Sequence, residues 1–188
     1  MEYFTAWNPG AQHLLLQQAR IKSIDLPAAL GVLWKEGPRS AALSAFFAGK
    51  MVPALSEGGA SRLPALADAF RELLPAASAG FLCAGEALYL FCGEGFSLYQ
   101  VQRVFGKRRP ACLLSGGGEL SCLAESDNLL FVCEGDLTER ERVQALLEGP
   151  APESAEALEK LAEALAKTLV CGEENAAGSG RILAFTVR

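Results

Sequence analysis

The stretch that decides the fold runs from Asp127 to Gly149 and reads DNLLFVCEGDLTERERVQALLEG. Leu129 to Cys133 is an apolar run too short for a helix, and it predicts a strand that is buried on both faces. Glu134-Gly135-Asp136 ends this run, and Thr138 with Glu141 then forms the capping box of a helix. A buried strand that leads through carboxylates into a capped helix fits two interpretations. One is a site that binds a metal ion or a phosphate, and the other is an ordinary polar turn.

Composition limits the kind of protein that this chain can be. The 188 residues predict a single domain, 1–188, which is large enough to bury a substantial core. A net charge of −5 argues against a nucleic-acid surface, and the basic cluster Lys107-Arg108-Arg109 predicts a solvated loop. We find neither an apolar run of about 18 residues nor a secretory signal pattern. We therefore expect a cytoplasmic protein that does not cross a membrane.

The cysteine pattern points to the same compartment. The six cysteines contain no Cys-x-x-Cys pair, and a chain of this size does not need disulfides. Cys83, Cys92, Cys122 and Cys133 lie in apolar runs, which predicts buried, reduced thiols. His13 is the only histidine, so a histidine-based metal site is not expected.

The spacing of apolar residues predicts the order of the elements. Helical spacing favours one helix pair at 40–55 and 61–75, with Ser40 and Ser61 as caps and a kink or stop at Pro53. From residue 79 onward the period falls to two, which indicates an antiparallel meander. A second helix pair follows at 138–148 and 154–170, and a last strand at 182–187. Paired helices on either side of about ten strands predict an α+β fold, a four-layer α/β/β/α sandwich of two antiparallel sheets with one helix pair on each outer face.

Three segments carry a resemblance to a known family: NLLFVCEGDL at 128–137, FLCAGEALYLFCGEGFSLYQ at 81–100 and GSGRILAFTVR at 178–188. They resemble segments of the PPM-type metal-dependent protein phosphatases, the protein phosphatase 2C family. Residues 128–137, NLLFVCEGDL, resemble the family's strand that ends in Ser-Asp-Gly-Leu. Residues 81–100, FLCAGEALYLFCGEGFSLYQ, and residues 178–188, GSGRILAFTVR, resemble its Gly-Asp-Ser hairpin and its closing Asp-Asn turn and strand. The resemblance is to a degenerate bacterial member. It implies a two-sheet sandwich in which aspartates hold two Mg²⁺ or Mn²⁺ ions for hydrolysis of phosphoserine or phosphothreonine.

The chain departs from the family at each position that the resemblance assigns to a metal ligand. Ala19 follows Gln17-Gln18 where the family has an aspartate, and Gly180-Arg181 replaces Asp-Asn, so these two ligands are lost. Glu36-Gly37 replaces Asp-Gly, and Glu134 replaces the aspartate of Ser-Asp-Gly. The resemblance therefore leaves four vestigial metal positions, Glu36, Gly37, Glu134 and Asp136. With a different gap placement, Glu174 is a substitute for the last aspartate of the family.

These departures favour a catalytically inactive domain, a pseudophosphatase that acts as a binding or regulatory module without a metal cofactor. Mg²⁺ requires near-octahedral oxygen ligands, and exchange of aspartate for glutamate moves a carboxylate outward by about 1.5 Å. The resemblance implies a protein partner such as a phosphoprotein or a kinase, and neither nucleic acid nor membrane. An alternative is a divergent serine/threonine phosphatase in which Glu36, Glu134 and Asp136 hold one weakly bound Mn²⁺ or Mg²⁺. A third hypothesis is an ordinary α+β domain whose likeness to the phosphatases is accidental.

Overall fold

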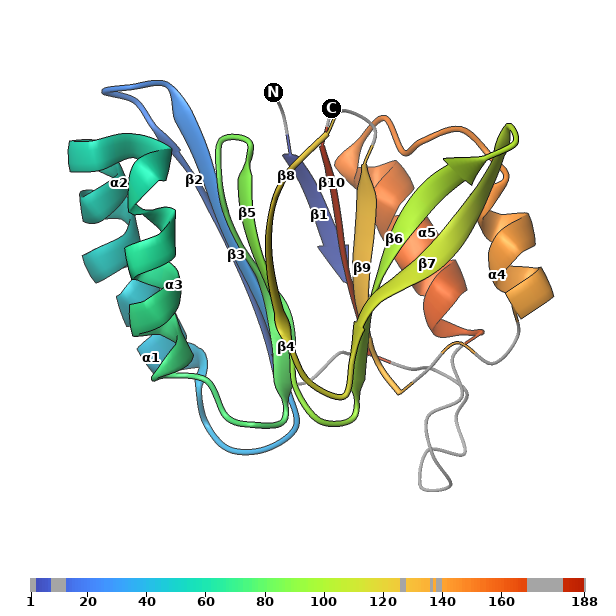
Figure 1. Ribbon diagram of the computed structural model, residues 1–188, viewed down its shortest axis with the longest axis horizontal. Helices are drawn as coiled ribbons and strands as arrows, with labels where there is room; N and C mark the ends of the chain where they lie inside the picture. Colours follow the sequence, from blue (N-terminus) through green and yellow to red (C-terminus); the bar gives the residue numbers. More distant parts are fainter. Residues whose placement is uncertain are drawn as a thin grey trace.

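Two antiparallel sheets stack face to face in the computed structural model, with helices on both outer faces (Figure 1). The structure describes residues 3–7, 13–125, 128–135, 137, 140–168 and 181–187. The α+β sandwich predicted from the paired helices and the period-two block is confirmed.

The first sheet, called sheet A here, has the strand order β1-β10-β9-β6-β7, and every neighbouring pair is antiparallel. Its central strand β9 contains the apolar run on which the fold prediction rests, and Leu129 to Cys133 are all buried. The strands of sheet A are β1 Tyr3–Trp7, β6 Phe96–Val104, β7 Lys107–Ser115, β9 Leu129–Glu134 and β10 Ile182–Val187.

The second sheet, sheet B, has the order β2-β3-β4-β5-β8 and is also antiparallel throughout. Its middle strand β4 is buried along its whole length. The strands of sheet B are β2 Leu14–Ile21, β3 Leu26–Trp34, β4 Ser78–Ala84, β5 Ala87–Cys92 and β8 Glu119–Leu123.

The first helical layer covers sheet B, and three details of its local structure differ from the prediction. Arg39, not Ser40, is the N-cap residue, and the helical layer continues past Pro53, which lies in the first turn of α2. Ser61 does not cap a helix but donates to the Gly58 carbonyl within a 3₁₀ turn. The segments of this layer are α1 Ser40–Phe46, η1 Phe47–Met51, α2 Val52–Gly58, η2 Gly59–Arg62 and α3 Leu63–Arg71.

The second helical layer covers sheet A. It consists of α4 Arg140–Leu147 and α5 Ala155–Ala166. The Ser154 hydroxyl caps α5 by accepting from the Ala157 N–H at 3.1 Å. The predicted cap Thr138 and the predicted helix end at 169–170 lie outside the described residues.

Three apolar clusters account for the layering. One lies between sheet B and its helices, one between sheet A and its helices, and one between the two sheets. Each sheet is therefore apolar on both faces, which explains why so many strand residues are buried. Among the described helices, none is both long and apolar enough to span a bilayer.

Two sequence predictions need correction. Cys83, Cys92 and Cys133 are buried free thiols as predicted, but Cys122 is only partly buried because it lies on the edge strand β8. Lys107-Arg108-Arg109 is not a loop. These residues begin β7, and the Arg108 side chain is buried against the end of α4.

Candidate functional site: the strand-end corner

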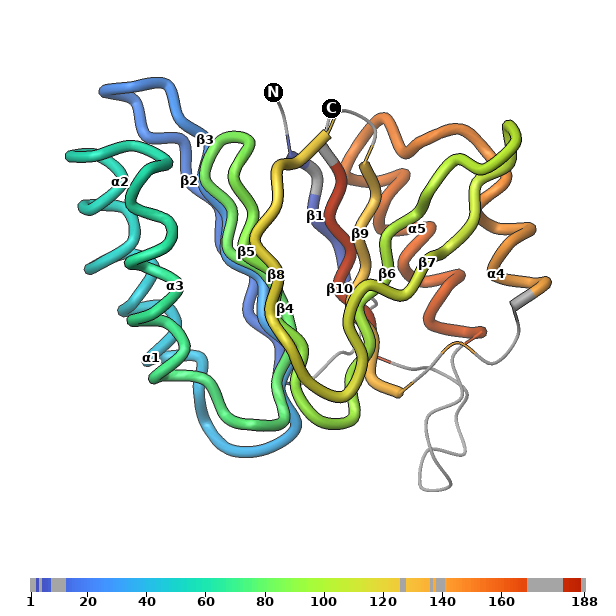
Figure 2. The backbone as a smooth tube through the Cα atoms, viewed as in Figure 1, coloured from blue at the N-terminus to red at the C-terminus, as the bar shows by residue number. Residues whose placement is uncertain are grey.

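The ends of three strands meet at the lower edge of the sandwich (Figure 2). β3 of sheet B ends at Trp34, β9 of sheet A ends at Glu134, and Arg181 lies immediately before β10. We call the cluster of Trp34, Glu134 and Arg181 the strand-end corner. It is the part of the fold to which the resemblance assigns the vestigial metal positions Glu36 and Glu134.

The Arg181 guanidinium is the centre of this corner. Its Nε donates to Glu134 Oε2 at 2.7 Å, and its Nη2 lies 2.6 Å from the same oxygen. Its Nη1 donates to the Trp34 carbonyl at 2.9 Å, so one side chain of sheet A reaches the backbone of sheet B. The side chains of Arg181 and Glu134 are 20% and 22% exposed, and this ion pair is therefore much less screened than a surface pair.

A second cation lies at the same edge. Lys35 follows Trp34, is partly buried, and places its amine 5.9 Å from the centroid of the Phe96 ring. A Cβ atom at residue 95 would overlap this amine, so Gly95 leaves the space that the lysine uses. The neighbouring turn is held by a hydrogen bond from the Gly135 N–H to the Gly95 carbonyl at 2.9 Å.

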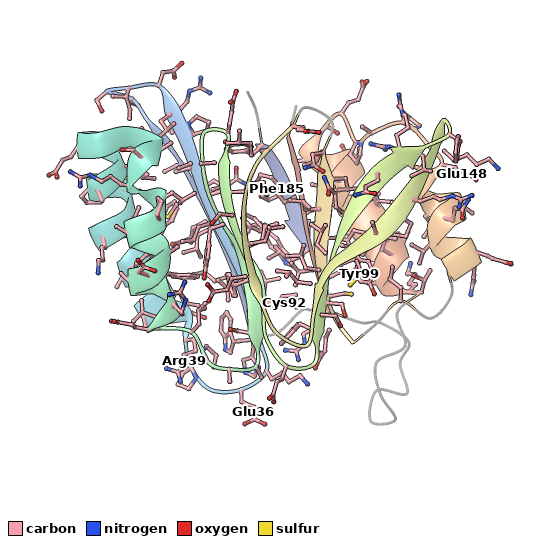
Figure 3. The ribbon with its side chains drawn as sticks, viewed as in Figure 1. Glu36, Arg39, Cys92, Tyr99, Glu148 and Phe185 are labelled. Carbon is pink, nitrogen blue, oxygen red and sulfur yellow. The ribbon has the colours of Figure 1, made fainter. Side chains whose placement is uncertain are left out.

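Glu36 and Gly37 follow the corner but do not enter it. Glu36 is exposed and points away from the sheets at the lower rim of the molecule (Figure 3). Gly37 adopts a φ of +84°, and its carbonyl accepts from Trp34 Nε1 at 2.8 Å. The sequence-predicted carboxylates Glu36 and Glu134 are therefore not oriented as a shared ligand set.

Ala19 is not at this corner at all. Antiparallel pairing places Ala19 opposite Ala28, six residues before Trp34 along β3. At about 3.3 Å per residue this separation is about 20 Å. Ala19 also packs against the apolar cluster between sheet B and the first helical layer. The position that the resemblance assigns to a lost ligand is therefore far from the strand-end corner. The residues beside the end of β3 are Leu14, which pairs with Leu33, and His13, whose carbonyl accepts from the Trp34 N–H at 3.0 Å.

The described part of the corner does not fit a divalent metal centre. Asp136, Gly180 and Glu174 lie outside the described residues, and within the described ranges no group of three or more potential His, Cys, Asp or Glu ligands occurs. Glu134 already pairs with a guanidinium. A divalent ion about 4 Å from that guanidinium would meet a repulsion of about 4 kcal/mol for each unit of its charge.

Sequence reasoning missed the two cations. Arg181 and Lys35 carry the electrostatics of the corner, whereas the prediction considered only lost carboxylates. A signal was present in Gly180-Arg181, because a basic residue in the Asp-Asn turn reverses the local charge rather than merely removing it.

Comparison of the whole structure with solved structures identifies the class of fold. The serine/threonine phosphatase of S. agalactiae aligns over 100% of both chains with a TM-score of 0.60 at 8% identity. The protein phosphatase 2C domain of SpoIIE from Bacillus subtilis aligns over 100% of this chain and 64% of its own, with a TM-score of 0.56 at 9% identity. A variant of a bacterial serine phosphatase aligns over 99% of this chain and 97% of its own, with a TM-score of 0.57 at 10% identity.

The chain therefore has the fold of the PPM-type, protein phosphatase 2C-like phosphatases. At the level of sequence, no family model and no curated protein matches it. Likeness at such low identity concerns the fold, and function has to be argued from the strand-end corner.

Proposed function

We propose that this chain is a pseudophosphatase, a protein phosphatase 2C-like domain that binds no catalytic metal and acts as a protein-binding or regulatory module. The observation that carries the proposal is the Arg181–Glu134 ion pair at 2.6 Å, in which a side chain supplies the positive charge at the strand ends. A metal-activated water is needed for hydrolysis in a two-metal site, and a carboxylate held by a guanidinium contributes little to such a site.

The partner that we propose is a protein, such as a phosphoprotein or a kinase. The similar structures include a serine/threonine phosphatase and the phosphatase domain of the cell fate determinant SpoIIE, which supports a role in protein regulation. The described cysteines are all free thiols, which supports a reducing compartment such as the cytoplasm.

Calorimetric titration with Mn²⁺ tests the proposal directly, together with hydrolysis assays on p-nitrophenyl phosphate and a phosphothreonine peptide. We expect no binding of two ions and no turnover above background. Arg181→Ala frees Glu134 and is expected to bind Mn²⁺ more tightly than the unmodified protein, still without turnover. Arg39→Ala, at an exposed arginine near the same edge, is the matched control and should leave the titration unchanged (Figure 3).

The alternative, a divergent phosphatase with glutamate ligands, makes the opposite prediction. Micromolar binding of two Mn²⁺ ions by the unmodified protein, with turnover that Glu134→Ala abolishes, would establish an enzyme and overturn the proposal.

A further inference from the structure

The hairpin of β6 and β7 carries an apolar tip that the rest of the fold does not use. Phe105 is 102% exposed, and the neighbouring Val104 is 37% exposed. The two strands are joined by the two-residue turn Phe105-Gly106, whose φ values are +50° and +78°. Positive φ at both central residues is the requirement of a type I′ turn.

Neither turn chemistry nor packing explains a phenylalanine at residue 105. Type I′ turns prefer Asn-Gly, Asp-Gly or Gly-Gly, and a bulky side chain at positive φ is an unfavourable choice. A fully exposed ring contributes nothing to the core. A residue that weakens its own turn and exposes its whole apolar surface is a candidate for contact with something outside the chain.

The tip segment itself is basic in a chain that is acidic overall. Residues 103–109, RVFGKRR, contain four basic and no acidic side chains, whereas the chain has a net charge of −5. Arg103, Lys107 and Arg109 are exposed. Arg103 lies directly opposite Arg108 in the register of the two strands.

The hairpin extends sheet A beyond the end of β9. β9 ends its pairing with β6 at Leu129 and Val101, so residues 102–104 pair only with β7 (Figure 2). Close to the turn, Arg108 is buried and donates to the Gly149 carbonyl at 3.4 Å, which connects the hairpin to the segment after α4. The tip is therefore held in a defined position clear of the sheet.

We propose that the tip of the β6–β7 hairpin docks on an anionic phospholipid surface. Phe105 and Val104 enter the boundary between head groups and acyl chains, while Arg103, Lys107 and Arg109 lie against lipid phosphates. A bilayer interface accepts a convex apolar protrusion without a matching pocket, and an anionic leaflet attracts clustered basic side chains. The charges alone could serve to protect the edge strand β7, but edge protection does not account for Phe105. This inference does not depend on the proposed function, and it departs from the expectation, drawn from the resemblance, that the chain has no membrane partner.

Co-sedimentation of the full chain with vesicles tests the proposal. We expect binding to phosphatidylcholine vesicles that contain phosphatidylglycerol, loss of binding at high salt, and no binding to phosphatidylcholine alone. Phe105→Asn should weaken binding about tenfold or more, since it removes the buried ring. Because Asn-Gly suits the turn better than Phe-Gly, this variant should also unfold at a higher temperature than the unmodified protein.

Two control variants distinguish binding through the hairpin tip from nonspecific binding through other exposed apolar or charged side chains. Leu123→Ala removes another exposed apolar side chain on the edge strand β8, and Lys22→Glu reverses an exposed charge in the β2–β3 turn. Both should bind vesicles like the unmodified protein, whereas Arg109→Glu should not. Equal binding by Phe105→Asn and the unmodified protein would overturn the proposal. Phe105-dependent dimers in sedimentation without lipid would also overturn it, because the tip would then belong to contact between copies.

Discussion

At the scale of the residue, Arg181 contacts both sheets, because its guanidinium pairs with Glu134 and donates to the Trp34 carbonyl. We expect Arg181→Met to lower the free energy of unfolding by about 2 kcal/mol, because it leaves the Glu134 carboxylate partly buried without its partner. Arg181→Lys should retain part of this stability, because it retains the charge but not the fork geometry. Urea denaturation of both variants measures the effect.

A double-mutant cycle with Glu134→Gln supplies the control for Arg181. If the two side chains act as a pair, Arg181→Met should lower the free energy of unfolding much less in the Glu134→Gln variant than in the unmodified protein. Additive losses, or an Arg181→Met variant as stable as the unmodified protein, would contradict the role assigned to the ion pair.

At the scale of the element, the contact between β3 and β4 depends on a close approach of their backbones. Any Cβ atom at residue 80 would overlap the Gly31 carbonyl oxygen, and one at residue 31 would overlap the Phe81 ring. We therefore expect Gly80→Ala to cost about 3 kcal/mol or more in the free energy of unfolding, or to prevent soluble expression.

Helical Gly49 is the matched control for this substitution, since a Cβ there meets open space. Gly49→Ala should stabilise the protein by about 0.5–1 kcal/mol, because it lowers the backbone entropy of the unfolded chain without a clash. Equal melting temperatures for Gly80→Ala and the unmodified protein would show that β3 and β4 can separate without cost.

At the scale of the whole molecule, the buried thiols link stability to alkaline pH. Burial raises the pKa of the Cys83 thiol to about 12 and that of Cys92 to about 11. Unfolding returns the pKa of both thiols to about 8.5. Above that pH, the unfolded chain therefore loses protons that the folded protein keeps. The contribution of these two thiols to stability should therefore be constant below about pH 8 and fall between about pH 9 and pH 11.

The expected slope in that window is about 1.4 kcal/mol per pH unit for each thiol, measured as urea denaturation at a series of pH values. Cys83→Ala should reduce the slope after correction for its loss at neutral pH. Exposed Cys112 provides the control, since Cys112→Ser should leave the slope unchanged. Burial also raises the pKa of Tyr3, which adds to the loss at the alkaline end.

The architecture was predictable because hydrophobic periodicity reports burial directly. The apolar run in β9 and the three-four spacing in α3 and α5 placed these elements within a few residues of their observed bounds. Caps were less predictable: Ser61 lies in a 3₁₀ turn, since any nearby carbonyl can compete for a serine hydroxyl. The start of β7 was missed because Lys107-Arg108-Arg109 has the composition of a loop but lies in a hairpin that only cross-strand pairing reveals.

The sequence by itself determined the two-sheet sandwich, because its strands and helices follow from residue types and their local order. Only the tertiary structure decided which residues meet at the strand ends. Because of the strand register, Ala19 lies about 20 Å from the strand-end corner. The stacking of the two sheets places Arg181 in contact with Trp34 and Glu134. Register and stacking bring into contact two residues that are 147 positions apart in the sequence, and no local sequence pattern predicts that contact.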